Sequence, residues 1–215
     1  MDPSPSQTDE QLVIAFLAGD RSAYKTLIER FHPDLLRFLY RLVGDQAAAE
    51  DLFQDTFLQV YQSAGTFDTS RTFRPWLFTI AANKARDYLR KRSRRRTLEL
   101  SAPVAGGRGN GDGATFVDLM QIDIPSPEQI VDLAERDQLV QKALEGLSPT
   151  LREILLLSYF QRLSYQQIAD DLGIPLGTVK SRLHAAVAAF ARRWHAVTRD
   201  LRDNPADPEP PEPDA

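Results

Sequence analysis

The stretch from Leu163 to Phe190, LSYQQIADDLGIPLGTVKSRLHAAVAAF, is the part of the chain that most restricts its fold. Ser164 can cap the start of a helix, because Gln167 stands at the third helical position and completes a capping box worth about 1 kcal/mol. Gly173 can take the left-handed conformation that ends this helix, and Pro175 suits the opening turn of a second one. The spacing therefore predicts two short helices that cross at a tight turn, which is a helix-turn-helix.

The second of these helices has two different faces. Helical periodicity places apolar side chains on one of them: Val179, Leu183, Ala186, Val187 and Phe190. The other face carries small or polar residues, namely Gly177, Thr178, Ser181, His184, Ala185 and Ala188, with Lys180 and Arg182 beside them. Small residues permit close approach to a major groove, while hydroxyls and bases can contact base edges and phosphates. The pattern favours a DNA-reading helix over an ordinary helix pair with a solvated outer face.

Composition excludes several kinds of site. The 215 residues include no cysteine, so disulfides, thiolate metal sites and cysteine nucleophiles are excluded. The three histidines (His32, His184 and His195) are scattered and suggest neither a metal nor a cofactor site. The N-terminus lacks the pattern of a signal peptide, and no apolar run approaches the ~20 residues that span a bilayer. We expect a cytoplasmic protein.

Charge is unevenly distributed along the chain. The formal net charge of −4 argues at first against a nucleic-acid partner. From Arg86 to Arg96, however, Asp87 is the single acid among the bases Arg86, Arg90, Lys91, Arg92, Arg94, Arg95 and Arg96. Such segregation suits a protein that presents one face to phosphate and another to a basic protein.

The pattern of the whole chain predicts an all-α protein of two small helical domains joined by a flexible linker. Breaks at Gly19-Asp20 and Gly44-Asp45 imply helices that fold back on one another. A glycine-rich stretch without periodicity follows, and the acidic, proline-rich C-terminus cannot form a core. The expected division is a disordered N-terminus (1–8), a helical bundle (9–97), the linker (98–126), the helix-turn-helix domain (127–202) and a disordered tail (203–215).

Two helices of the bundle carry distinctive faces. In AEDLFQDTFLQVYQ, periodicity buries Leu52, Phe53, Thr56, Phe57 and Val60 and exposes Asp51, Asp55, Leu58 and Gln62, with Gln54 beside them. An acidic face with an exposed leucine suits a protein interface, although a simple solvated face fits as well. The next helix, from about Thr72 to Ser93, is predicted to bury Phe73, Leu77, Ile80, Ala81 and Tyr88 and to turn Thr79, Asn83, Arg86 and Arg90 outward.

Three segments, in matching order and spacing, resemble the extracytoplasmic-function (ECF) group of bacterial sigma factors: AEDLFQDTFLQVYQ, TFRPWLFTIAANKARDYLRKRSRR and LSYQQIADDLGIPLGTVKSRL. The resemblance covers about Asp9 to Arg96 and Glu128 to Trp194. It implies a non-enzymatic subunit that binds core RNA polymerase and promoter DNA. It also implies an anti-sigma factor, often membrane-bound in such relatives, and no cofactor, metal or small-molecule substrate.

The resemblance also implies roles for individual residues. Asp51, Gln54 and Asp55 are expected to face the clamp helices of the largest polymerase subunit, and periodicity places Leu58 on the same face. The residues expected to read and melt the minus-ten element are Phe67, Asp68, Arg71, Arg74, Asn83, Arg86 and Arg90. Those expected to read the minus-thirty-five element as duplex are Thr178, Lys180, Ser181, Arg182 and His184. Many relatives carry a long basic residue where this chain has Ala185, which implies a shifted promoter preference.

Two other classes of protein could share some of these features. A free-standing regulator could use the same helix-turn-helix, but a response regulator needs an α/β receiver, and the N-terminal half reads as helices. A hydrolase could use paired carboxylates such as Glu50, Asp51 and Asp55. Glu50 points away from the other two, no histidine lies nearby, and neither domain has a glycine-rich phosphate loop. The sequence therefore disfavours an enzyme.

Overall fold

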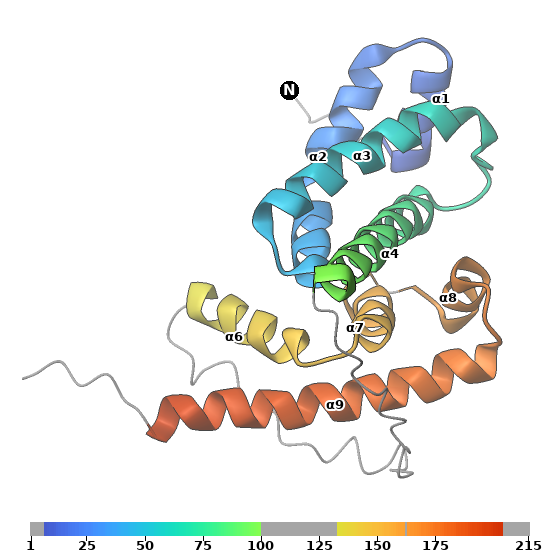
Figure 1. The fold of residues 1–215 in the computed structure, drawn as a ribbon. Coiled ribbons are helices and arrows are strands. Elements are labelled where there is room, and N and C mark those ends of the chain that lie inside the picture. The colour runs from blue at the N-terminus through green and yellow to red at the C-terminus, as the bar shows by residue number, and fades with distance from the viewer. Residues whose placement is uncertain (1–6, 100–132, 162, 204–215) are drawn as a thin grey trace, which may run out of the picture.

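A computed structural model describes residues 7–99, 133–161 and 163–203, and every regular element in these ranges is a helix (Figure 1). The N-terminal domain contains α1 (Asp9–Leu17), α2 (Arg21–Val43), α3 (Gln46–Ser63), the 3-10 turn η1 (Ala64–Thr66) and α4 (Phe73–Glu99). The C-terminal domain contains α6 (Leu133–Glu145), α7 (Pro149–Leu155), the π-helical turn η3 (Leu156–Phe160), α8 (Tyr165–Leu172) and α9 (Leu176–Asp203). The prediction of an all-α fold with two helical domains is confirmed for the described residues.

Short glycine-aspartate corners join the first three helices. Gly19 and Gly44 have φ of +102° and +70°, values that favour glycine, and each lies where a helix has ended. The aspartate after each glycine caps the next helix. Asp20 accepts a hydrogen bond from the Ser22 amide at 2.8 Å, and Asp45 accepts one from the Ala48 amide at 3.0 Å. The breaks predicted from the sequence are thus confirmed at both corners.

The ends of the bundle lie slightly beyond the expected boundaries. Thr8 belongs to the fold, because its side chain and backbone exchange hydrogen bonds with Gln11 at 3.2 and 2.9 Å and so cap α1. At the other end α4 continues to Glu99, two residues past the expected end of the bundle at residue 97. The rest of the expected linker, the helix start near Pro127 and the tail after Asp203 lie outside the described residues.

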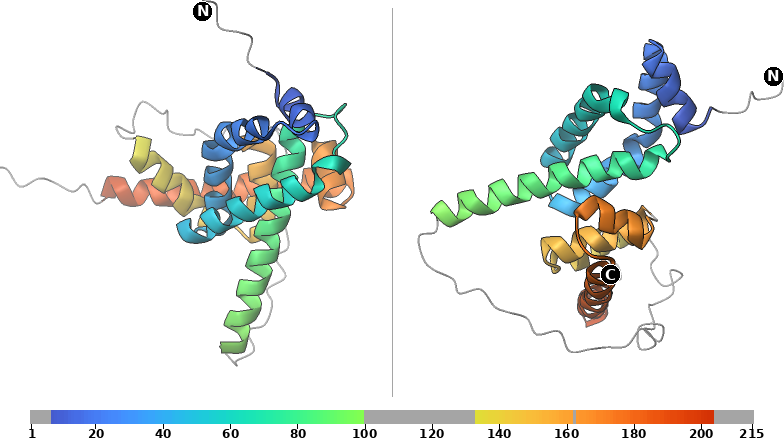
Figure 2. Two further views of the ribbon diagram at one scale, coloured as in Figure 1. Left: turned by 90° about the horizontal axis from the view of Figure 1, so that it is seen from above. Right: turned by 90° about the vertical axis from the view of Figure 1, so that its right-hand side faces the viewer.

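Four phenylalanines form the centre of the N-terminal core. Phe31 and Phe38 on α2 meet Phe73 and Phe78 on α4 edge to face, with ring centroids 5.5 and 5.1 Å apart for the pairs Phe31–Phe73 and Phe38–Phe78. All four are fully buried. This packing fixes the first half of α4 against α2, while the second half extends away from the bundle (Figure 2).

The helix-turn-helix has the local structure that its sequence predicts. Ser164 and Gln167 form the capping box at the start of α8, with hydrogen bonds of 2.8 and 3.2 Å. Gly173 ends α8 in the left-handed conformation at φ +61°. The carbonyl of Pro175 then accepts from the amides of Thr178 and Val179 in the first turn of α9.

The long helix α9 also organises the rest of the C-terminal domain. It has 28 residues, and its far half packs on α6, where Trp194 lies with Leu139 and Ala143 in a small buried cluster. Phe190 stacks on Trp194 with ring centroids 6.1 Å apart. The end that reads DNA in the predicted motif is therefore continuous with the end that holds α6.

The two domains pack directly against each other, which the sequence did not predict. One apolar core continues from α2 and α4 into α7 and α9. Arg152 on α7 is buried at this junction and donates to the carbonyl of Leu42 at 2.8 Å, satisfying one of the carbonyls left open at the end of α2. Burial lowers the pKa of the Arg152 guanidinium, and the charge of Glu145 opposes that change. None of the described helices is both long and apolar enough to cross a membrane.

Candidate nucleic-acid interface

The exposed face of α3 is the one predicted from periodicity. Asp51, Gln54 and Asp55 are exposed, and Leu58 keeps 56% of its surface accessible. Tyr61, one turn further on, is 54% exposed and enlarges this acidic and apolar surface. Its ring contacts Phe16, with centroids 5.4 Å apart, so the surface has a rigid aromatic edge that the sequence analysis missed.

The loop between α3 and α4 combines a buried anchor with an exposed turn. Phe67 is only 7% exposed and packs against Phe73 and Trp76, so it supports the loop from below. Asp68 accepts hydrogen bonds from the hydroxyl and amide of Ser70 at 2.7 and 3.0 Å. These bonds lower the pKa of the Asp68 carboxyl, and the bond from the hydroxyl has the larger effect. Arg71 lies beside it, 3.6 Å from Nε to the Asp68 carboxylate, and is largely exposed. Asp68 and Arg71 are thus presented to solvent on a fixed turn.

Three of the arginines of α4 are engaged in ion pairs: Arg74, Arg86 and Arg90. Arg74 donates to Asp34 at 2.8 Å and to Gln161 at 3.1 Å, and its guanidinium lies 5.0 Å from the centre of the Phe78 ring. Arg90 pairs with Asp87 at 2.9 Å. These contacts hold the guanidinium groups in defined positions along the helix.

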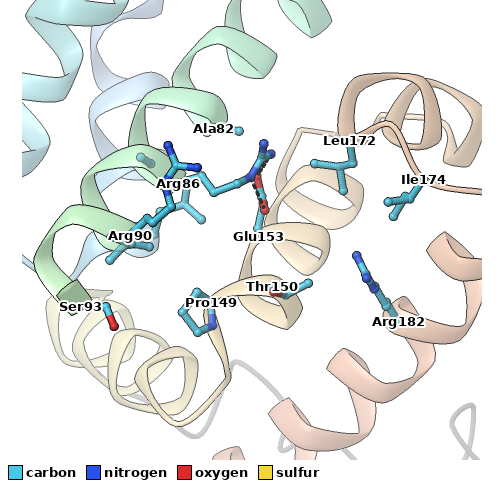
Figure 3. A pocket seen from close by; sticks show the side chains of 13 residues that line it. Ala82, Arg86, Arg90, Ser93, Pro149, Thr150, Glu153, Leu172, Ile174 and Arg182 are labelled. Carbon is cyan, nitrogen blue, oxygen red and sulfur yellow. Dashed lines mark hydrogen bonds and ion pairs between the residues drawn. The ribbon is translucent and has the colours of Figure 1, made fainter. Parts of the chain in front are cut away.

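Arg86 makes the most extensive of these contacts. Its Nη2 and Nε atoms lie 2.5 and 3.4 Å from the two carboxylate oxygens of Glu153 on α7, while its Nη1 donates to the Asn83 side chain at 3.0 Å. Figure 3 shows Arg86 and Glu153 pointing toward each other beside a pocket of about 410 Å³ between α4 and the C-terminal domain. Arg90 and Arg182 also line this pocket, so it has a basic rim.

The predicted outward face of α4 is therefore partly covered. Thr79, expected to point to solvent, forms a hydrogen bond with Asp171 on α8. The helix also buries Phe78, Ala82 and Ala85, which were not assigned to the core. The expectation failed because periodicity identifies a second helical face but does not reveal whether another domain lies on it. A charge pair inside the run LREILLL, at Arg152 and Glu153, was the available signal of a buried polar contact.

Burial of Asp171 beside Thr79 changes the pKa of its carboxyl. Burial raises the pKa of the Asp171 carboxyl, the hydrogen bond with Thr79 opposes the rise, and the charge of Asp170 adds to it. The Thr79 hydroxyl has one proton and also lies 2.8 Å from the carbonyl of Pro75. A protonated Asp171 can donate to Thr79 while Thr79 donates to Pro75, so the neutral form satisfies both contacts.

Asp171→Asn should therefore change how stability depends on pH. A raised pKa in the folded state means that wild-type Asp171 stabilises the fold most at low pH, and this contribution is lost as pH rises through the raised pKa. The amide is neutral throughout and can also donate to Thr79. We expect the free energy of unfolding of Asp171→Asn, relative to wild type, to increase between about pH 3 and pH 7. Urea denaturation across this range measures it. Glu29→Gln, at an exposed position, is the control, and its difference in free energy of unfolding from wild type should not change with pH. A difference for Asp171→Asn that is also constant would contradict the raised pKa of Asp171.

At the start of α9 the predicted DNA-reading residues divide into two groups. Lys180 and Ser181 are exposed, as is Ala185, whereas Thr178, Arg182 and His184 are half-buried. Ser181 also donates to the carbonyl of Thr178 at 3.1 Å, which fixes its hydroxyl on the outer face. Behind them Val179, Leu183 and Ala186 are buried, as the pattern predicts. Among the described side chains no group of three or more potential metal ligands occurs.

The fold and these surfaces define a two-domain helical protein with a helix-turn-helix, a basic helix and a separate acidic surface on α3. Residues 27–95 match the family model Sigma-70 region 2, and residues 137–190 match Sigma-70, region 4. The chain is 31% identical to the ECF RNA polymerase sigma factor SigW of Bacillus subtilis over 86% of its own length and 92% of that relative. It is also 31% identical to the RNA polymerase sigma-H factor of Pseudomonas aeruginosa, over 90% and 97% of the two chains.

A solved structure shows the same fold. The sigma factor RpoE of Bartonella quintana, in complex with the anti-sigma factor NepR, matches 81% of this chain and 98% of that one at 26% identity and a TM-score of 0.55. The chain belongs to the ECF sigma factors of bacterial RNA polymerase. It is an alternative sigma factor that directs transcription.

Proposed function

We propose that this sigma factor binds core RNA polymerase through α3 and recognises promoters at two separate elements, acting by binding and not by catalysis. Residues 9–97 form the polymerase-binding and minus-ten domain, and residues 127–202 form the minus-thirty-five domain. The observation that carries this proposal is the match of both sigma regions, in order, on one chain whose α3 face is exposed. Since polymerase and chromosome occupy the bacterial cytoplasm, the protein functions there.

The minus-ten surface consists of the loop before α4 and the outward side of α4. A melted strand is held by cationic groups together with a pocket that accepts an unstacked base. Asp68 and Arg71 stand on the fixed turn above Phe67 and shape such a pocket, and the Asn83 amide offers the base contact. Arg74, Arg86 and Arg90 contact phosphates, exchanging their present carboxylate partners for phosphate oxygens.

The minus-thirty-five surface is the start of α9. Exposed Lys180 and Ser181 lie where they can contact phosphate and a base edge, with Thr178, Arg182 and His184 around them. The exposed methyl group at Ala185 offers no hydrogen bond to a base. We therefore infer a promoter preference at that base pair that differs from relatives with a long basic side chain there.

An anti-sigma factor is a further proposed partner. The Bartonella relative was solved in complex with the anti-sigma factor NepR. The acidic and apolar surface of α3 is exposed in the free chain and offers a site at which such a partner would exclude polymerase. With no cysteine in this chain, any thiol-based sensing resides on that partner.

Run-off transcription on a genomic promoter library tests the proposed function. Core polymerase with the chain should give discrete start sites, while core alone gives none of them. Footprinting of the same promoters distinguishes a sigma factor from the remaining alternative, a free-standing regulator. A sigma factor needs core polymerase for tight, specific binding. Protection of duplex DNA by the chain alone at physiological salt would favour the regulator.

Arg86→Ala combined with Arg90→Ala should slow open-complex formation and flatten its salt dependence. Each phosphate contact on a single strand contributes about 0.7 to the slope of log K against log salt, so losing two should reduce that slope by about 1.4. Open-complex formation measured with permanganate between about 50 and 200 mM salt gives the slope. A matched double variant of exposed bases elsewhere, Arg21→Ala with Lys25→Ala, removes the same charge. Equal slopes for the two double variants would exclude phosphate contacts by Arg86 and Arg90.

A further inference from the structure

The proposed minus-ten side of α4 lies against the C-terminal domain at three points. Thr79 is hydrogen-bonded to Asp171 on α8, Arg86 is paired with Glu153 on α7, and Arg74 donates to Gln161, which follows η3. From Arg74 to Arg86 these contacts extend over 13 residues of α4, or about 18 Å of helix. The C-terminal domain therefore covers a substantial length of the surface that the melted strand needs.

Glu153 contacts Arg86 through both of its carboxylate oxygens. Two carboxylate oxygens meet two guanidinium nitrogens, which is the same forked geometry by which arginine binds phosphate. The Glu153 side chain is only 10% exposed, whereas that of Arg86 is 45% exposed. Because a buried carboxylate needs a charged partner, Glu153 commits Arg86 to this pair as long as the domains stay together.

Apolar packing brings the two helices close enough for this pairing. Ala82 and Ala85 on α4 are buried, and their small side chains let α7 approach. Ile154 and Leu155, next to Glu153, belong to the same continuous core as these alanines. Polar pairing and apolar packing thus stabilise one arrangement of the domains.

We propose that this packed arrangement is a self-inhibited state, in which α7 and α8 occupy the minus-ten surface and Glu153 takes the place of a phosphate on Arg86. Promoter recognition then requires the two domains to separate. The packed form can still bind polymerase through α3, because Asp51, Asp55 and Leu58 are exposed in it. The proposal rests on the function assigned above to α4.

A reversible crosslink tests the need for separation. Since the chain has no cysteine, Thr79→Cys with Asp171→Cys introduces a single pair of thiols. A bis-methanethiosulfonate reagent with a one-carbon bridge joins them, each thiol displacing one methanesulfinate, and dithiothreitol releases the bridge. With core polymerase and a promoter that the wild type transcribes, we expect the bridged protein to give at least about tenfold less run-off transcript than the unbridged protein. Reduction should restore the amount.

The matched control is a bridge inside one domain. Asp9 on α1 and Arg30 on α2 are paired at 2.6 Å, so Asp9→Cys with Arg30→Cys accepts the same reagent without linking the two domains. This control should transcribe equally before and after bridging. Full transcription by bridged Thr79→Cys/Asp171→Cys would overturn the proposal, as would failure of the two thiols to bridge in the folded protein. Absence of transcription from wild type and all reduced variants would instead refute the proposed function.

A second variant weakens the packed state without a crosslink. Glu153→Gln removes the charge that holds Arg86 but keeps the shape of the side chain. Anisotropy of a fluorescent single-stranded minus-ten oligonucleotide should show the free Glu153→Gln chain binding about three- to tenfold more tightly than wild type. Glu29→Gln, which neutralises an exposed carboxylate of α2, should bind as wild type does. Equal affinities for Glu153→Gln and Glu29→Gln would overturn the proposal.

Discussion

Asp51→Arg combined with Asp55→Arg is expected to weaken binding to core RNA polymerase at least about a hundredfold, or ~2.8 kcal/mol. Both carboxylates are exposed on α3 beside Leu58, so they are available to a basic partner surface. Close charge pairs across an interface contribute about 1.5 to 7 kcal/mol each, and reversal replaces attraction by repulsion. Titration of labelled sigma factor with core polymerase measures the change in Kd.

A matched single reversal on the same domain controls for net charge. Glu29→Arg on α2 changes the charge by the same amount as Asp51→Arg alone, at an exposed position outside α3. It should bind polymerase within about threefold of wild type, whereas Asp51→Arg should bind more weakly than Glu29→Arg. Circular dichroism should show all these variants folded, since none of these carboxylates lies in the core. Wild-type affinity of the Asp51/Asp55 variant would refute the assignment of α3 to the polymerase interface.

Phe78→Ala is expected to lower the free energy of unfolding by about 3 to 5 kcal/mol. The ring is fully buried, packs edge to face on Phe38 and lies under the guanidinium of Arg74. Its removal leaves a cavity between α2 and α4 that neither helix can fill without moving. Urea denaturation followed by circular dichroism gives the loss.

The half-buried Phe53 on α3 provides the comparison. Its ring contacts Phe57 and His32 near the surface, so Phe53→Ala removes the same atoms with less burial and a smaller loss of stability. A loss for Phe78→Ala below about 1 kcal/mol, or equal to that for Phe53→Ala, would show that Phe78 does not fix α4 on α2. The two results together measure how strongly the packing of Phe78 holds α4 on α2.

The local structure of this chain is largely predictable from its sequence. The capping box of Ser164, the left-handed Gly173 and the glycine-aspartate corners at residues 19–20 and 44–45 involve residues at most a few positions apart. Their geometry is determined by hydrogen bonds and steric limits that act within one turn. The family resemblance added the order of the domains, and the matches to both sigma regions confirm it.

The packing of one domain on the other was not predictable in the same way. Arg86 and Glu153 are 67 positions apart, and Thr79 and Asp171 are 92 apart. Helical periodicity separates faces, but it treats every polar face as solvated. Periodicity therefore places Arg86 on the polar face of α4. It cannot identify the buried partner Glu153, because that pairing arises only when the two domains pack together. The individual DNA contacts of both domains stay predictions.

The length of α9 has a mechanical consequence. With 28 residues it forms a rod of about 42 Å, and α6 grips one end while the other presents Lys180 and Ser181. Because α7 and α8 also pack along this rod, it moves together with them, and a rotation of about 10° about the α6 end displaces the start of α9 by about 7 Å. That is roughly the rise of two base pairs. Under the proposed function, a small change in how α6 packs on α9 would therefore shift the start of α9 along the minus-thirty-five element by a comparable step.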